Sequence, residues 1–392
     1  MAKVLIVGGG VAALEAALAL QELAPELAQV ELVAPDRSFV YRPLLVTGEA
    51  RSFPLKRLVE SAGATVRGGI VTAVDPEEHL VFTPEGDELT FDLLLLAPGA
   101  VPATAIPGAL SFRGPADAAE LAEMRDDALA GEVDSFVFAV PSGARWVLPL
   151  YELALLTRAQ LVDAGAIGVR VTVVTPEDAP LELFGATASS AIAELLEDRG
   201  IELVRGTTSL SFAAGALQIA PGGSVKADRA VALPRLEGPR LNGVFSDPQG
   251  FLPTDLFGQV HGEVDIWAAG DATSFPLKQG GIAAQQADAA AESIAARVGA
   301  TLEPSPFRPV LRGLLLTGMS PRFLRAEGSP AVSVVDTEPL WWPPAKIVGR
   351  YLAPFLARHL GLSQLLPDAA RESAVPVEIE LDPAEHGVWS EV

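Results

Sequence analysis

The stretch that decides the fold is Val4-Leu5-Ile6-Val7-Gly8-Gly9-Gly10-Val11-Ala12-Ala13, close to the N-terminus. Its four leading apolar residues predict a buried parallel strand, and residues 14–23 have helical spacing. Between the two lies the pattern G-x-G-x-x-A. Gly8 permits a tight turn, Gly10 lets a pyrophosphate approach the backbone, and Ala13 lets the helix pack closely on the strand. The order of strand, turn and helix predicts a dinucleotide-binding unit with the pyrophosphate at the helix N-terminus.

The second strand is predicted at Val30-Glu31-Leu32-Val33. In a dinucleotide-binding unit this strand usually ends on an acid that binds a ribose hydroxyl. Here Ala34 and Pro35 stand at that place, and Asp36 comes next. Two interpretations of Asp36 stay open: a displaced ribose ligand, or a turn-forming residue after proline.

Composition excludes several classes of function. With 392 residues the chain has room for two or three domains, and 49% hydrophobic residues exclude a disordered chain. The absence of cysteine excludes disulfide, persulfide and thiolate chemistry. The four histidines, His79, His261, His359 and His386, show no metal-ligand spacing, so no metal site is predicted. A net charge of −22 argues against a nucleic-acid partner.

Three later segments extend the pattern. Residues 91–100 read as an apolar strand that ends in Ala97-Pro98-Gly99, and residues 264–272 as a strand that ends in Gly270-Asp271. Lys278-Gln279-Gly280-Gly281 then precedes an alanine-rich helix. This ordered set resembles the flavoproteins with two dinucleotide-binding domains, in particular the branch of type II NADH dehydrogenases and sulfide:quinone oxidoreductases. The resemblance covers about residues 1–330.

The resemblance implies one non-covalent FAD, held by both the glycine motif and the late Gly-Asp. Asp271 matches the aspartate that holds the ribityl chain, and Gln279 to Gly281 match the helix start that lies against the flavin pyrimidine. Pro98 departs from the threonine of the family's A-T-G motif. The cofactor-binding residues expected are Gly8, Gly10, Val11, Ala12, Ala13, Asp36, Arg37, Arg42, Val71, Ala97, Gly99, Gly270, Asp271, Gln279, Gly280 and Gly281.

Lys278 is the candidate catalytic residue. A cation beside the flavin would raise its reduction potential. The alternative interpretation is a surface lysine at the start of the helix.

A second nucleotide-binding unit is predicted from the strand at residues 135–140. The turn after it, Pro141 to Trp146, has one glycine where a pyrophosphate site has three. Glu177, after the next strand, could bind a ribose, but the phosphates would have no seat. This pattern resembles the sulfide:quinone branch, in which the second domain does not bind NADH. That branch depends on cysteines next to the flavin, and this chain has none. NAD(P)H therefore stays an alternative second cofactor.

The C-terminal part is predicted to hold a hairpin of residues 311–316 and 322–326, and a helix over 346–360. The apolar face of that helix has two interpretations. With the preceding tryptophans it could dock residues 340–360 on a membrane surface, or it could pack on the flavin domain or on a second subunit of a homodimer. Residues 375–381 alternate as an edge strand does, and the rest of the tail is an acidic, solvated run.

The fold class predicted is α/β, with two Rossmann-like domains, the second inserted in the first, and a small C-terminal cap. The FAD domain is expected over 1–115 and 261–300, the second domain over 116–260 and the cap over 301–392. The expected function is an FAD-dependent oxidoreductase that passes electrons from an unidentified small-molecule donor to a quinone or another small acceptor. An NAD(P)H:acceptor oxidoreductase and a binding protein without turnover are the alternatives. The N-terminus has no secretory pattern and no run is long enough to span a bilayer, so a cytoplasmic protein is expected, or one held at the inner face of the membrane.

Overall fold

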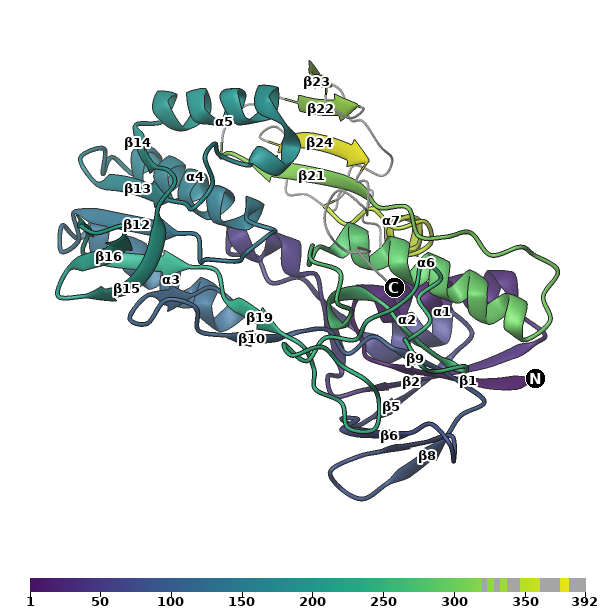
Figure 1. Cartoon of the computed structure of the whole chain (residues 1–392). Coiled ribbons are helices and arrows are strands. Elements are labelled where there is room, and N and C mark those ends of the chain that lie inside the picture. The colour runs from purple at the N-terminus through teal and green to yellow at the C-terminus, as the bar shows by residue number, and fades with distance from the viewer. Residues whose placement is uncertain (319–322, 328–331, 337–345, 360–373, 381–392) are drawn as a thin grey trace.

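Two α/β units lie side by side in the computed structural model (Figure 1). The structure describes residues 1–318, 323–327, 332–336, 346–359 and 374–380. The first unit contains a parallel sheet with the strand order β20-β9-β1-β2-β5. Its strands are β1 (Ala2–Val7), β2 (Ala28–Ala34), β5 (Thr65–Gly68), β9 (Leu93–Leu96) and β20 (Ile266–Ala268). The last of these follows the whole second unit in sequence, so the second unit is an insertion between two strands of the first.

Helices α1 (Val11–Leu23) and α6 (Gly280–Arg297) pack against one face of this sheet and against each other. Both are rich in buried alanine, for example Ala16 and Ala290. Because alanine carries only a methyl group, the two helix backbones can approach each other closely. Helix α2 (Leu55–Ser61) lies between β2 and β5 in sequence. Because β1 and β20 belong to a parallel sheet, their carboxyl ends lie at the same edge. Helices α1 and α6 follow these two strands in sequence, so their N-termini lie at that edge.

Short antiparallel sheets surround this core. One pairs β3 (Ser38–Val40) with β4 (Ser52–Pro54), and the 3₁₀ helix η1 (Arg42–Thr47) lies between them in sequence. Another contains β6 (Ala73–Asp75), β7 (Leu80–Phe82) and β8 (Glu88–Thr90).

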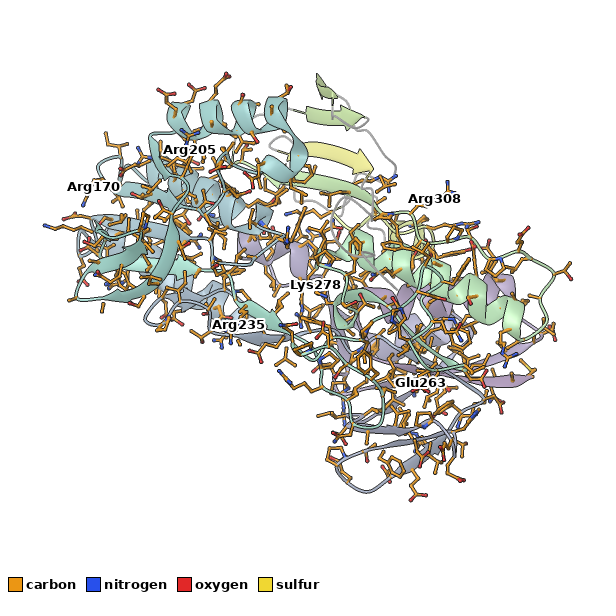
Figure 2. All side chains as sticks on the ribbon, in the orientation of Figure 1. Arg170, Arg205, Arg235, Glu263, Lys278 and Arg308 are labelled. Carbon is orange, nitrogen blue, oxygen red and sulfur yellow. The ribbon has the colours of Figure 1, made fainter. Side chains whose placement is uncertain are left out.

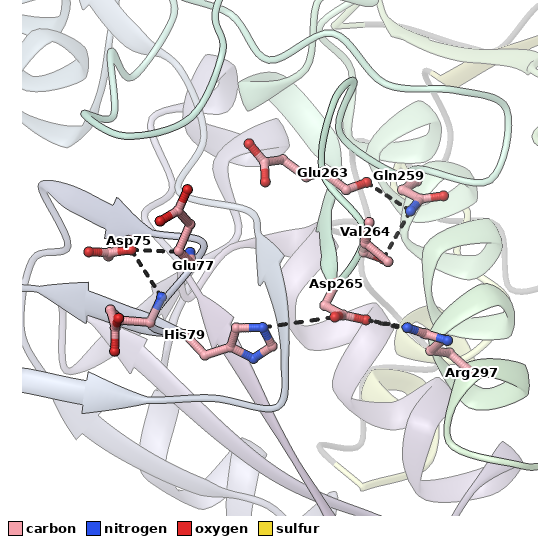
Figure 3. A network of polar contacts seen from close by, with 9 residues as sticks. Asp75, Glu77, His79, Gln259, Glu263, Val264, Asp265 and Arg297 are labelled. Atoms are coloured by element: carbon pink, nitrogen blue, oxygen red, sulfur yellow. Dashed lines mark hydrogen bonds and ion pairs between the residues drawn. The ribbon is translucent and has the colours of Figure 1, made fainter.

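A polar network ties the three-stranded sheet to the main sheet (Figure 3). Arg297 of α6 donates to Oδ1 of Asp265 at 3.0 and 3.1 Å, and Nε2 of His79 lies 3.9 Å from Oδ2 of the same residue. Asp265 directly precedes β20, at the amino end of that strand. The network therefore lies at the edge opposite to the glycine turn, and we assign it a structural role.

The second unit has its own parallel sheet, with the order β11-β18-β12-β13-β14. The strands are β11 (Leu110–Ser111), β12 (Ser135–Ala139), β13 (Arg170–Val174), β14 (Ile201–Val204) and β18 (Arg229–Ala232). Its helices are α3 (Pro115–Leu129), α4 (Leu148–Asp163), the 3₁₀ helix η2 (Glu182–Phe184) and α5 (Ala186–Asp198). A three-stranded sheet of β15 (Thr208–Ala213), β16 (Ala216–Ala220) and β17 (Ser224–Lys226) packs beside it. Both units are Rossmann-like, so the α/β fold class predicted from the sequence is confirmed.

The two chain segments that cross between the units run antiparallel. They are β10 (Val101–Ala103) and β19 (Arg235–Glu237), which pair with each other (Figure 1). The 3₁₀ helix η1 of the first unit also contacts α3 and α4 of the second.

The predicted hairpin is wrong. Strand β21 (Val310–Leu316) pairs not with its neighbour in sequence but with β24 (Ala374–Glu380), the strand predicted in the tail. Strand β22 (Phe323–Glu327) pairs instead with β23 (Val332–Asp336). The β21–β24 ladder joins seven residue pairs, against five between β22 and β23. Both ladders pair backbone N–H and C=O groups, and the strand from the tail takes the place beside β21 that the prediction gave to residues 322–326.

The predicted C-terminal helix is shorter than expected, because α7 spans only Leu352–His359. The N–H groups of Tyr351 and Leu352 donate to the Glu15 carboxylate, each at 2.7 Å, and not to helix carbonyls. Pro354 lies in the first turn, where a helix tolerates proline. The apolar side chains of α7 are buried, for example Leu352 and Leu356, and α7 contacts α1. Packing on the first unit, hereafter called the flavin-type unit after the resemblance described above, is therefore the interpretation that the structure favours for this face.

Candidate functional site

The glycine turn after β1 is built for close approach of two strand ends. The N–H of Gly8 donates to the carbonyl of Val33 at 2.8 Å, and its φ is +128°. A Cβ added at Gly8 would overlap the carbonyl oxygen of Ala97, just after β9. The sheet order places β2 on one side of β1 and β9 on the other, so this turn lies at the topological switch point. Ligands of open parallel sheets bind at such a point.

Gly10, at the N-cap of α1, faces open space. A Cβ added there would meet no heavy atom within 4 Å, and the same holds for Gly99, whose φ is +83°. Among the residues that the structure describes, no side chain caps this helix, and its first turn of Val11, Ala12 and Ala13 holds no acid. The helix N-terminus therefore offers free N–H donors and a partial positive charge to an anion such as a pyrophosphate.

Gly270, the first residue of the Gly270-Asp271 motif, lies close to the glycine turn after β1. Its φ is +77°, and an added Cβ would lie 3.0 Å from the Cβ of Ala12 and 3.5 Å from that of Ala283. Its N–H donates to Oε1 of Gln286 at 2.9 Å. Gly270 thus fills the narrow space between α1 and α6, and it sets Asp271 beside the N-terminus of α1.

Asp271 is half-buried beside two cations. Burial raises the pKa of its carboxyl, and the charges of Lys278 and Arg42 act against that rise. In the described part of the chain no hydrogen-bond donor reaches the Asp271 carboxylate. A partly desolvated carboxylate that lacks a donor suits the hydroxyls of a ribityl chain.

Lys278 lies near the middle of the molecule, where the two units meet (Figure 2). Its ammonium group donates to the carbonyl of Thr273 and lies 3.9 Å from the ring centroid of Phe251. Burial lowers the pKa of Lys278 to about 8, although Asp271 and Asp247 act in the opposite direction. The lysine is therefore held in place and partly desolvated, unlike a lysine on an open surface.

Both polar atoms of the Gln279 side chain are hydrogen-bonded to backbone groups of the protein. Its Oε1 accepts from the N–H of Ile282 at 2.9 Å, and its Nε2 donates to the carbonyl of Arg312 at 3.0 Å. Gly280 begins α6, and an added Cβ there would lie 3.0 Å from Ile347. The start of α6, which the resemblance places against the flavin, is therefore also covered by the C-terminal segment. Gly281 follows in the first turn of the helix.

The other expected cofactor residues are dispersed. Asp36 and Arg37 are exposed in the turn after β2, the strand whose end lies next to the glycine turn. Arg42 is exposed at the start of η1, close enough for its charge to act on Asp271. Val71 is buried in an apolar cluster behind the sheet.

The corresponding site of the second unit is occupied by its own side chains. Oε2 of Glu177 accepts from the hydroxyl of Tyr151 at 2.6 Å and from the hydroxyl of Thr175 at 2.8 Å. Tyr151 belongs to the first turn and a half of α4 and is fully buried. Trp146, in the turn itself, packs edge-on against Phe184 with ring centroids 5.9 Å apart. The acid that could bind a ribose is therefore already hydrogen-bonded inside the protein.

Sequence reasoning missed three buried acids that hold the C-terminal segment. Glu15 and Glu152 are fully buried, and Asp288 forms a side-chain hydrogen bond with Glu15. The signal was present, because each acid interrupts an apolar or alanine-rich helical run, and a buried acid needs a partner. The partners, from residue 346 onward, are too distant in sequence to be inferred.

Residues 2–130 and residues 163–216 each match a family described as pyridine nucleotide-disulphide oxidoreductase. These two segments are similar to the pyridine nucleotide-disulphide oxidoreductase family. The family consists of FAD-dependent oxidoreductases, and the turn, helix N-terminus and Asp271 fit FAD. The chain itself has no cysteine, the residue that forms disulphides.

Relatives and solved structures agree with this family. An "NADH dehydrogenase-like protein" of Mycobacterium tuberculosis (strain CDC 1551 / Oshkosh) is 26% identical over 290 residues, which are 69% of this chain and 72% of the relative. The sulfide:quinone oxidoreductase of the hyperthermophilic bacterium Aquifex aeolicus is similar in structure, with a TM-score of 0.78 and 19% identity over 86% of this chain and 87% of that one. A ferredoxin reductase from Rhodopseudomonas palustris reaches a TM-score of 0.63 at 18% identity, over 83% and 85% of the two chains. At these identities the structures show the fold alone.

Two further observations concern the residues that the structure describes. None of their helices combines the length and the apolar character that a bilayer crossing requires. Within the same ranges no group of three or more acids and histidines is placed to hold a metal ion. Trp341 and Trp342, part of the segment expected to contact a membrane, lie outside the described residues.

Proposed function

We propose that this flavoprotein passes electrons through a non-covalent FAD to a quinone or another small acceptor, and that its donor is not NAD(P)H bound in the usual way. Residues 1–115 and 261–300 would form the FAD domain, residues 116–260 the second domain and residues 301–392 the cap. The single observation that carries the donor part is the hydrogen bond between Tyr151 and Glu177. The kinship to sulfide:quinone oxidoreductase in fold and to an NADH dehydrogenase-like protein in sequence supports the quinone part.

FAD would supply the redox chemistry when bound, and the residues of the chain hold and tune it. Gly8 and Gly10 admit the pyrophosphate to the N-terminus of α1, and Asp271 accepts hydrogen bonds from the ribityl chain. The N-terminus of α6 stabilises negative charge on the flavin ring. Lys278 adds a positive charge near Asp271 to that of the helix N-terminus. A positive charge close to the flavin would favour its reduced form.

The second domain lacks the means to hold a dinucleotide. Its turn presents Arg145 and Trp146 where a pyrophosphate needs bare backbone, and Pro149 removes an N–H donor from the first turn of α4. Glu177 would have to release Tyr151 before it could accept from a ribose. NADH would therefore find neither a binding site for its pyrophosphate nor a free carboxylate to accept from its ribose.

We expect NADH to reduce the flavin slowly, over minutes or more at millimolar concentration. Stopped-flow mixing without oxygen, with NADH, NADPH or sulfide in separate experiments, measures the loss of the oxidised flavin absorbance. Reduction by micromolar NADH within milliseconds would contradict the proposal. It would give first place to an NAD(P)H:acceptor oxidoreductase, the activity suggested by the name of the mycobacterial relative. A flavin that none of these donors reduces would favour a binding protein without turnover.

Replacement of Asp271 by alanine should lower FAD affinity far more than replacement of Asp36. Loss of a charge-assisted hydrogen bond costs about 1.5–3 kcal/mol, or about 10-fold to 100-fold in affinity. Asp36 is exposed in the turn after β2 and serves as the control. The flavin-to-protein ratio after dialysis, measured for both variants, checks this. Equal losses would remove Asp271 from the proposed site.

A further inference from the structure

The C-terminal segment 346–358 is fastened to the flavin-type unit by one buried carboxylate. Oε1 of Glu15 accepts from the N–H of Tyr351, and Oε2 accepts from that of Leu352, both at 2.7 Å. These two N–H groups open helix α7 and would otherwise lack partners. The chain passes Glu15 so closely at Gly349 that an added Cβ would overlap the carboxylate. Glu15, on α1, therefore caps α7 from a different helix.

A second carboxyl group touches the first. Asp288, on the neighbouring helix α6, is hydrogen-bonded to Glu15. Two carboxylates cannot share such a bond unless one of them carries a proton. Burial, the largest cause, and the nearby charge of Glu15 together raise the pKa of Asp288 to about 9. Asp288 is therefore the protonated partner at neutral pH, and Glu15 keeps the charge that binds the two N–H groups.

The other charged groups around Glu15 and Asp288 do not change this assignment, in which the two carboxyl groups share one proton. Arg350 acts to lower the pKa of Asp288, but its guanidinium is exposed and already paired with Glu292 at 3.2 Å. Glu292 on α6 acts to raise the pKa of Asp288, and Glu22 on α1 acts on Tyr351. Burial raises the pKa of Tyr351 to about 12, so the phenol stays neutral over the range in which the pair titrates.

The other end of the segment reaches the candidate flavin site and the second unit. Ile347 packs on Gly280 at the start of α6, and its N–H donates to the hydroxyl of Tyr41 at 3.1 Å. Lys346 donates to both carboxylate oxygens of Glu152, at 2.6 and 2.5 Å. The segment thus spans from the capped start of α7 to the helix start that would face the flavin.

We propose that Glu15 and Asp288 form a proton-dependent lock, which holds segment 346–358 across α1 and α6 and thereby keeps Ile347 over the start of α6. Asp288 is a positioning residue in this arrangement. It donates its proton to Glu15, and Glu15 in turn accepts from the backbone of the segment. The lock involves only groups of the chain itself, so it does not depend on the proposed function.

The direction of the pH dependence follows from proton counting. The closed lock holds a proton on Asp288 up to pH of about 9. Opening exposes the carboxyl to water, where its pKa returns to about 3.9 and the proton leaves. Between these two values one proton is released on opening. The opening equilibrium therefore rises by up to about tenfold per pH unit and levels off above pH 9. The lock is tighter at pH 6 than at pH 9.

Hydrogen exchange at the amides of Tyr351 and Leu352 tests the lock directly, because these are the N–H groups that Glu15 binds. The full-length protein is compared at pH 6, 7, 8 and 9, with rates corrected for the intrinsic pH dependence of exchange. In the wild type, protection should fall by up to about tenfold per pH unit. In Asp288→Asn, whose amide donates to Glu15 without titrating, protection should be retained and independent of pH. Amides inside α4 serve as the internal reference.

Two results would overturn the lock. The first is wild-type protection at these two amides that does not change with pH, and this result stands even if a variant fails to fold. The second is a pH slope in Asp288→Asn equal to that of the wild type. Glu15→Gln, which offers only one acceptor atom, should lose protection at every pH. Because exchange needs no electron donor, a failure of the lock is distinguishable from a failure of the proposed function.

Discussion

Gly8→Ala is expected to unfold the flavin-type unit or to leave it unable to fold, even without cofactor. The new Cβ would overlap the carbonyl oxygen of Ala97, which belongs to the backbone of a buried strand end and cannot turn aside. Alanine is also strained at a φ of +128°. Together the overlap and the strain should cost at least about 3 kcal/mol. Urea unfolding of the cofactor-free protein, followed by circular dichroism, measures the loss.

Gly10→Ala separates fold from cofactor binding. Its Cβ would meet no atom of the protein, so the cofactor-free variant should stay within about 1 kcal/mol of the wild type, the usual effect of alanine at an N-cap. The same Cβ would enter the space that a pyrophosphate needs, and FAD affinity should fall about 10-fold to 100-fold through lost charge-assisted hydrogen bonds. If Gly10→Ala binds FAD as the wild type does, the pyrophosphate does not lie at this helix N-terminus.

Local signals in the sequence predicted the first unit well. The apolar run 4–7 and the glycine turn forecast β1, α1 and the narrow approach at Gly8, because each depends on residues only a few positions apart. The same reasoning placed β12 and β13 and the abnormal turn of the second unit. The family resemblance and the FAD cofactor followed from the order of these local motifs along the chain.

Contacts between distant segments could not be predicted in this way. The pairing of β21 with β24 joins residues 58 to 70 positions apart, and a neighbouring strand was the natural local choice. Helix α7 starts at Leu352 because a carboxylate on α1 takes its first N–H groups. Glu177 was recognised as a ribose-type acid, but its bond to Tyr151 depends on how α4 packs on β13. In each case tertiary packing decides between options that are equal in the local sequence.

Lys346→Met is expected to destabilise the chain by about 3–5 kcal/mol, the usual effect of leaving a buried charge without its partner. Glu152 is fully buried, and both of its oxygens accept from Lys346, while Oε1 also accepts from the N–H of Leu316 at 2.8 Å. Lys346 also lies 3.4 Å from the carbonyl of Pro43, so it bridges the two units. The free energy of unfolding in urea at pH 7 measures the effect. Lys226→Met, at an exposed lysine in β17, is the matched control and should change little.

The pH dependence and a double variant identify the cause of that loss. Burial raises the pKa of Glu152, and the charge of Lys346 acts against that rise. Without the lysine the pKa rises further, so Glu152 takes up a proton as pH falls and the destabilisation shrinks from pH 7 toward pH 5. Adding Glu152→Gln to Lys346→Met removes the unpaired charge, and most of the lost stability should return. A double variant no more stable than Lys346→Met would mean that the lysine acts through packing of its stem at the junction of the two units, and not through its charge.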